Sequence, residues 1–141
     1  MKKISRGLQN NNPGNIRRGG FRYKGEKAVS EDAEFRQFES IEWGYRAMFA
    51  LLHTYKVKHG CRTLRQMISR YAPPSENNTE NYISRVVYAT HLASNIDIST
   101  LNGAVMTAIV AAMSEVEIGT KADMAAIWRG WKLFIADFGP K

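Results

Sequence analysis

Apolar side chains recur at intervals of three and four residues from Ser40 onward, the spacing that places them on one face of an α-helix. The first run is Ile41, Tyr45, Met48, Leu52 and Tyr55. Ser40 can cap the start of this helix, and Gly60 can end it. Thr63 and Gln66 form a capping-box pattern ahead of a second helix, which the proline pair at 73–74 stops.

Three further helices are expected after this proline pair. Thr79 can cap the first of them. The run 103–118, GAVMTAIVAAMSEVEI, is the most apolar, so it should be central, and Gly119 can end it. Thr120 with Asp123 opens the last helix. The region after residue 40 should thus hold about five helices.

The first forty residues have a different composition, rich in glycine and asparagine, with short mixed runs separated by turn signals. Phe35 and Phe38 flank two polar residues in one such run. This pattern predicts a small antiparallel hairpin or three-stranded sheet. We therefore expect one α+β domain over 1–141, with a turn and small sheet at 1–39 and helices at 40–141.

Charge and length narrow the classes of protein. The chain has 141 residues, and 20 basic against 13 acidic side chains give a net charge of +7. This net positive charge favours binding to polyanions, and nucleic acid and bacterial cell wall are two such partners. No run approaches the ~18 apolar residues of a membrane span, and no apolar stretch near the N-terminus predicts a signal peptide. Cys61 is alone, which excludes an internal disulfide.

Glu117 is the acidic residue whose setting is most unusual. It continues an apolar stripe at the end of the 103–118 helix. The stripe is formed by Met106, Val110 and Met113. Partial burial and the negative end of the helix dipole both raise a carboxyl pKa, as a general acid requires. Glu115 lies on another face of the helix. The alternative is that Glu117 is solvated or paired with Lys121.

Other chemistries find little support in the sequence. No Cys or carboxylate stands at metal-ligand spacing from the three histidines, and no phosphate-binding glycine loop is present. We expect neither metal nor cofactor. The run IRRGGFRYKG interleaves arginines with aromatic residues. Such a run can bind nucleic acid or sugars, or it can be a solvated strand with two aromatic side chains in the core.

The run RGLQNNNPGNIR, with the motifs that follow it, resembles a family of small phage and prophage proteins over residues 5–88. The same region is similar to a segment of bacterial cell-wall glucosaminidases of the lysozyme-like superfamily. Its matching residues are Asn11, Asn12, Gly14, Asn15, Ile16, Arg17, Tyr23, Gly25, Phe35, Arg36, Phe38, Ser40, Tyr71 and Tyr82.

One departure from this second resemblance concerns the catalytic glutamate. In those enzymes it lies on a helix upstream of the asparagine run, whereas here nine residues precede Asn10 and none is acidic. The C-terminal AIVAAMSEVEIG looks like the missing helix, as a circular permutation would place it. The resemblance then implies Glu117 as general acid, Glu115 as the reserve, and Tyr82 beside the site.

The resemblance implies cleavage of the β-1,4 link between N-acetylmuramic acid and N-acetylglucosamine in peptidoglycan. A hydrolase usually needs a second carboxylate, for which Glu31, Asp32 and Glu34 are candidates, whereas a lytic transglycosylase could use one glutamate. The expected substrate-binding residues are Asn11, Asn12, Asn15, Arg17, Tyr23, Glu34 and Tyr71.

The expected protein is a monomer, made in the bacterial host cytoplasm without a signal peptide, that acts at the cell wall or is part of the virion. Two alternatives remain. One is a non-catalytic phage structural or wall-binding protein that keeps the fold. The other is a nucleic-acid binder, against which the mixed charges and the lack of a basic helix stripe argue.

Overall fold

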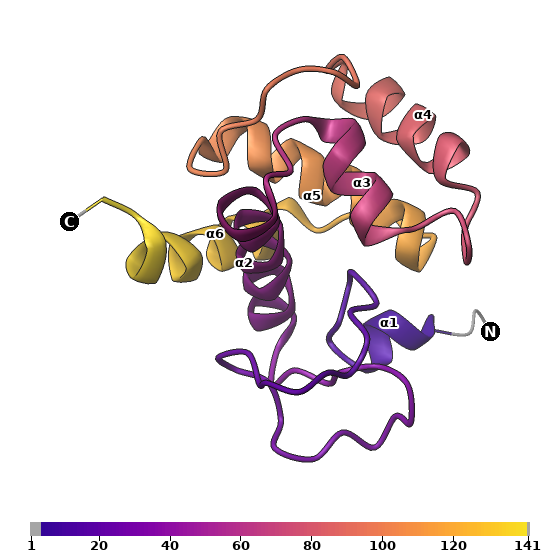
Figure 1. Ribbon diagram of the computed structural model, residues 1–141. Helices are drawn as coiled ribbons and strands as arrows, with labels where there is room; N and C mark the ends of the chain where they lie inside the picture. Colours follow the sequence, from indigo (N-terminus) through magenta and orange to yellow (C-terminus); the bar gives the residue numbers. More distant parts are fainter. Residues whose placement is uncertain (1–3, 141) are drawn as a thin grey trace.

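A computed structural model describes residues 4–140, and its regular elements are α-helices (Figure 1). They are α1 (Arg6–Gln9), α2 (Ile41–His59), α3 (Leu64–Tyr71), α4 (Thr79–Thr90), α5 (Gly103–Ile118) and α6 (Met124–Phe138). The five longer helices form the upper part of the molecule in Figure 1, and the N-terminal loops form the lower part. The expected helices after residue 40 are confirmed, whereas α1 was not predicted.

Local signals fix most helix ends. Gly60 ends α2 with φ 68°, and Gly119 ends α5 with φ 72°, both in the left-handed region that favours glycine. The capping box of Thr63 and Gln66 opens α3 as predicted. The cap of α4 differs from the prediction. Asn78 caps this helix, because the Thr79 hydroxyl donates to the Ala72 carbonyl instead.

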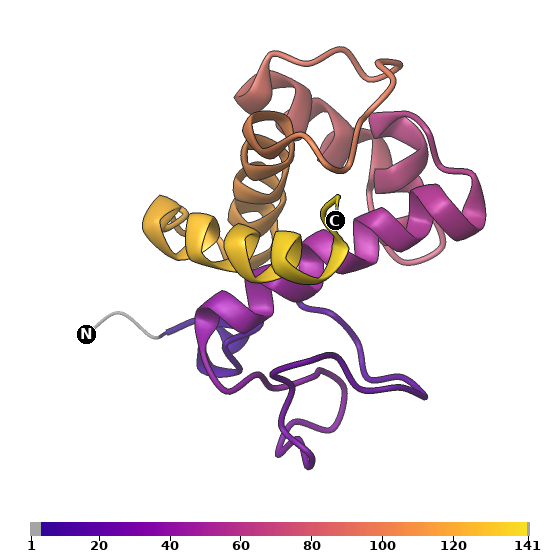
Figure 2. The same cartoon turned by 90° about the vertical axis from the view of Figure 1, so that its left-hand side faces the viewer.

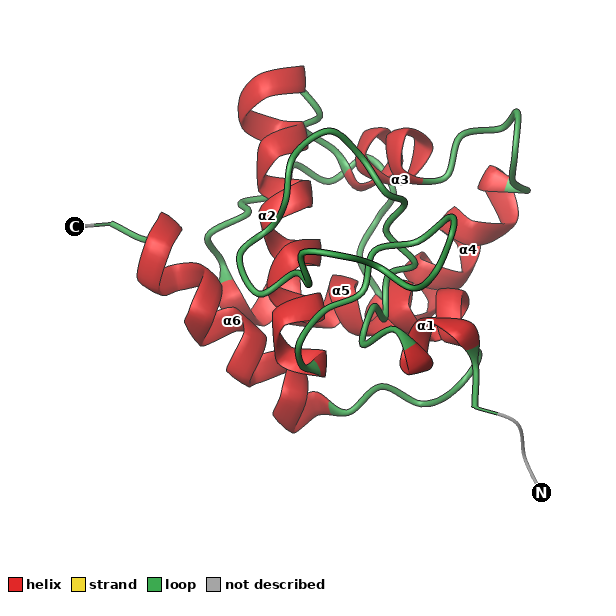
Figure 3. Ribbon diagram, turned by 90° about the horizontal axis from the view of Figure 1, so that it is seen from below, coloured by secondary structure: helices red, strands yellow, loops and turns green. Residues whose placement is uncertain are grey.

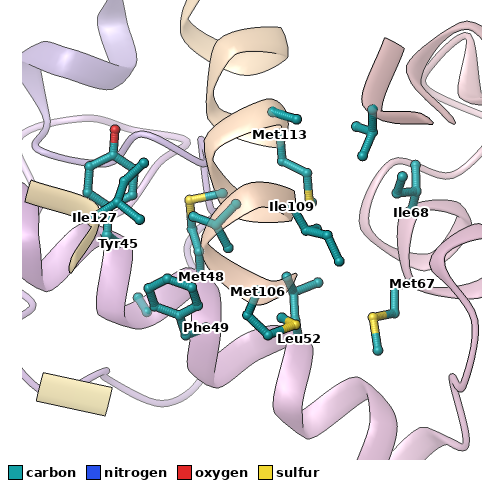
Figure 4. Close-up of a cluster of buried hydrophobic side chains, with 14 of the residues drawn as sticks. Tyr45, Met48, Phe49, Leu52, Met67, Ile68, Met106, Ile109, Met113 and Ile127 are labelled. Carbon is teal, nitrogen blue, oxygen red and sulfur yellow. The ribbon is translucent and has the colours of Figure 1, made fainter. Parts of the chain in front are cut away.

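The core lies where α5 meets the other helices. Helix α6 packs along α2, as Figure 2 shows, and α5 contacts α2, α4 and α6. In Figure 4, three side chains of α5 lie between Met48 on α2 and Met67 on α3. Those three are Met106, Ile109 and Met113, each at most 1% exposed. The prediction that 103–118 is central is therefore confirmed.

The predicted N-terminal sheet is absent, so the α+β fold class was wrong. Over residues 4–140 the structure contains no β-strand, only isolated antiparallel bridges, such as Arg17 with Phe35 and Glu26 with Phe38. The segment forms loops that cover one face of the helices (Figure 3). Side chains donate hydrogen bonds to several backbone carbonyls in these loops, beside the few bonds between backbone groups. Arg36, for example, donates to the carbonyls of Arg17 and Phe21.

No helix within residues 4–140 is long and apolar enough to cross a lipid bilayer.

Candidate functional site

A cleft of about 550 Å³ separates part of the N-terminal segment from the helices. One wall comes from residues 14–36, and the other comes from α2, α3 and the loop after α3. Glu117, at the end of α5, lies between them. The C-terminal end of α5 lies next to α1 and the N-terminal loop in Figure 1. Aromatic side chains supply much of the lining, namely Phe21, Tyr23, Phe35, Tyr55 and Tyr71.

The Glu117 carboxylate is held by two side chains from distant parts of the sequence. Asn15 Nδ2 lies 3.2 Å from Glu117 Oε1 and 3.1 Å from the Glu117 carbonyl oxygen, and donates to both. The hydroxyl of Tyr82, on α4, donates to Glu117 Oε2 over 3.0 Å. The N-terminal turn, α4 and α5 therefore meet at one half-buried carboxylate.

Burial raises the pKa of Glu117 above its ordinary value. The hydrogen bonds from Tyr82 and Asn15 and the charge of Arg17 lower this pKa, but burial prevails. Burial also raises the pKa of Tyr82, so its hydroxyl keeps its proton and remains a donor. The carboxyl group consequently keeps its own proton to higher pH than a solvated glutamate does, as a general acid requires.

The backbone at Asn15 is in the left-handed region, with φ 48°, which asparagine tolerates better than most residues. The preceding residue, Gly14, lies against the opposite wall, because its carbonyl accepts a hydrogen bond from the Tyr71 hydroxyl. A Cβ at Gly14 would lie 2.3 Å from that hydroxyl oxygen. Glycine is therefore required for the turn to approach Tyr71 and bring Asn15 to Glu117.

Asn11 and Asn12 direct their side-chain amides to the protein's own backbone. Asn12 is completely buried. It donates to the carbonyls of Ile16 and Arg36 and accepts from the amide of Ile16. Asn11 donates to the carbonyl of Phe38. Both were predicted to bind substrate, but in the structure their side-chain amides donate hydrogen bonds that stabilise the turn.

The remaining predicted residues divide between the cleft and other surfaces. Arg17, Tyr23 and Tyr71 line the cleft. Glu34 does not line it, and lies 3.4 Å from Arg17 Nη1 and 3.6 Å from Arg6 Nη2.

Glu115 faces away from the cleft, because its side chain points from α5 toward α4 and the start of α6. Its Oε2 accepts from the amide of Ala122 over 3.1 Å, and the side chain lies in a surface hollow beside Arg85 and Tyr88 of α4. The structure therefore does not bring Glu115 together with the proposed substrate-binding residues.

The candidates for a second carboxylate also lie outside the cleft lining. Asp32 accepts from Arg6 at 2.6 and 2.7 Å and from two backbone amides, and the hydrogen bond from Arg6 is the main reason its pKa is lowered. Glu31 does not line the cleft either. Instead, Glu76 lines it from the loop after α3. Sequence reasoning missed Glu76, since a polar SENNTEN loop gives no local sign of what it faces.

No group of three or more His, Cys, Asp or Glu side chains suited to a metal ion occurs within the part of the chain that the structure describes. The half-buried His53 instead lies 2.7 Å, through Nδ1, from the Thr100 hydroxyl.

A phage protein is similar to this chain over most of its length. "Protein P5" of Pseudoalteromonas phage PM2 is 37% identical over 123 residues, which cover 85% of this chain and 75% of the phage protein. This chain belongs to the Protein P5 family. Membership in the P5 family supports the predicted phage origin. No protein-family model matches the chain. The name Protein P5 states no activity.

Proposed function

We propose that this protein cleaves the glycan strand of peptidoglycan, with Glu117 as the general acid. The observation that carries the proposal is the half-buried carboxylate of Glu117, held by Asn15 and Tyr82 in an aromatic-lined cleft. The resemblance of the asparagine run to cell-wall glucosaminidases points to the same substrate.

In this proposal, a glycan strand lies in the cleft with its sugar rings against the aromatic side chains, which offer flat apolar faces. Glu117 donates its proton to the oxygen of the bond between two sugars, and that bond breaks as positive charge develops on the sugar ring. Asn15 and Tyr82 then stabilise the carboxylate that remains, since both donate hydrogen bonds to it.

The cleft leaves two routes for the second half of the reaction. A hydrolase would need another carboxylate to activate water or attack the sugar, and Glu76 is the candidate that the cleft offers. A lytic transglycosylase would use a hydroxyl of the substrate, with Glu117 alone. Mass spectrometry of the products separates the routes, because the transglycosylase product carries an anhydro ring and is lighter by one water.

The test of the proposal is Glu117→Gln, which keeps the shape of the side chain but removes its acidic proton. We expect release of soluble fragments from purified peptidoglycan to fall at least ~100-fold, the usual range for loss of a general acid. Glu115→Gln is the matched control, since Glu115 lies two residues earlier on α5 and bonds Ala122 instead. It should keep its activity.

Unchanged fragment release by Glu117→Gln would rule out the assignment. If the unaltered protein binds peptidoglycan and releases no fragments at high concentration, the cleavage proposal fails. The non-catalytic wall-binding function then takes its place.

A further inference from the structure

Arg70 is an exposed cation in the cleft that the described part of the protein does not neutralise. It lies in the last turn of α3 and lines the cleft. Among residues 4–140, no carboxylate oxygen lies within 4.0 Å of its side-chain nitrogens. The described carboxylates that line the cleft, Glu76 and Glu117, are therefore not ion-paired with Arg70.

The other two arginines that line the cleft already have partners. Arg36 is buried, lies 2.6 Å from a Glu26 oxygen, and donates to backbone carbonyls. Arg17 lies 3.4 Å from Glu34. Of the arginines that line the cleft within the described residues, Arg70 is the one without a carboxylate oxygen within 4.0 Å.

The Arg70 guanidinium lies over an aromatic ring. Its central carbon lies 5.3 Å from the centroid of the Tyr55 ring, within the range of a cation–π contact. The planar guanidinium carries five N–H donors, and two of them match the two oxygens of a carboxylate. A group that is positioned in this way loses less conformational freedom when a carboxylate binds.

We infer that Arg70 binds a carboxylate carried by the glycan strand, so that the cleft prefers an anionic muramyl strand to a neutral sugar chain. This inference rests on the proposed function. Two groups of peptidoglycan offer that chemistry. One is the set of carboxylates on the peptide attached to muramic acid, and the other is the lactyl carboxylate that is free where the peptide has been removed.

The experiment measures binding rather than cleavage, in the Glu117→Gln background so that the ligands stay intact. Calorimetry gives the Kd for three tetrasaccharides: a muramyl strand with its peptides, the same strand after amidase treatment, and a neutral N-acetylglucosamine tetramer. We expect at least one anionic ligand to bind at least about tenfold more tightly than the neutral one, the gain typical of one charge-assisted hydrogen-bonded pair. The tighter of the two anionic ligands identifies which carboxylate is bound.

Adding Arg70→Gln should bring the Kd of the anionic ligands to that of the neutral tetramer and leave the neutral Kd unchanged. Arg70→Lys should keep part of the preference, because charge remains while the paired donors are lost. Arg65→Gln is the matched control. It removes one positive charge from the same helix, but its guanidinium is paired with Glu80 outside the cleft.

Equal affinity of the Glu117→Gln protein for all three ligands overturns the inference, as does a preference that survives Arg70→Gln. These binding results can be distinguished from a failure of the proposed cleavage activity. A protein that cleaves peptidoglycan but binds neutral and anionic strands alike keeps Glu117 as the acid and loses only the role of Arg70.

Discussion

At the scale of single residues, the chemistry of the cleft depends on a competition at Glu117. Burial removes water from the carboxylate and raises its pKa, while Tyr82 and Asn15 donate to the ionised form and lower it. Burial is the larger effect, because both donors are neutral and replace only part of the lost hydration. Asn15 and Tyr82 therefore set how far the pKa rises, as well as where the carboxyl group points.

Tyr82→Phe tests this competition through the pH dependence of cleavage. Removal of the hydroxyl takes away a bond that lowers the pKa of Glu117, so that pKa should rise further. Because a general acid is lost as pH rises through its pKa, the alkaline limb of the pH–rate profile should move to higher pH. Tyr88→Phe, an exposed tyrosine on the same helix, should leave the limb in place. If the alkaline limb of the Tyr82→Phe profile stays in place or moves to lower pH, the Tyr82 hydroxyl does not lower the pKa of Glu117.

At the scale of elements, the N-terminal segment is organised by asparagine and arginine side chains rather than by paired strands. The Asn12 amide bonds the backbones of both Ile16 and Arg36, beside the backbone hydrogen bond that the Arg36 amide donates to the Ile16 carbonyl. Gly44 lets α2 approach this turn, since a Cβ there would lie 2.1 Å from the Asn11 carbonyl oxygen. The result is a compact loop layer that carries Asn15 to the end of α5.

Asn12→Ala should destabilise the protein by about 2–4 kcal/mol, because three buried hydrogen bonds are lost and the Ile16 amide is left without its partner. Urea unfolding measures this change in the free energy of unfolding. Asn81→Ala, at an exposed position on α4, should change it by less than about 0.5 kcal/mol. If Asn12→Ala lowers the free energy of unfolding by no more than Asn81→Ala does, the turn does not depend on Asn12.

At the scale of the whole molecule, the N-terminal segment contacts the last two helices at two places. Asn15 bonds Glu117, 102 residues away. On another side, Asp137 of α6 lies 2.7 Å from an Arg46 nitrogen on α2 and 3.2 Å from Lys24 in the N-terminal segment. Arg46 is buried, so its charge depends on this carboxylate for compensation. The N-terminal segment is thus tied to α5 at the cleft and to α6 on another side.

Asp137→Asn should lower the Tm at neutral pH, since the buried Arg46 charge loses its partner. The hydrogen bond from Arg46 is the main reason that the pKa of Asp137 is lowered, so its stabilisation is present above the ordinary aspartate pKa. It is lost as pH falls through the lower, folded-state pKa. The Tm difference from the unaltered protein should therefore shrink in acid. Asp97→Asn should have a smaller effect at neutral pH, because its partner Arg62 is exposed.

The sequence by itself determined the helices after residue 40 and most of their ends. Caps such as Thr63 with Gln66, and helix stops such as Gly60 and Gly119, act over four or five residues and so can be seen locally. The apolar stripe of α5 also indicated that Glu117 would be partly buried, and the resemblance pointed to Asn15 and Tyr82 near it.

Only the tertiary structure decided which side chains face the cleft. It turned Asn11 and Asn12 inward and Glu115 toward α4 and Ala122, and it brought Glu76 and Arg70 into the lining. It also replaced the expected sheet with loops that isolated backbone pairs and the side chains of asparagine and arginine hold together. The cleft is made of contacts between residues that lie far apart in the sequence, such as Asn15 and Glu117. Such contacts leave no periodic pattern in the sequence.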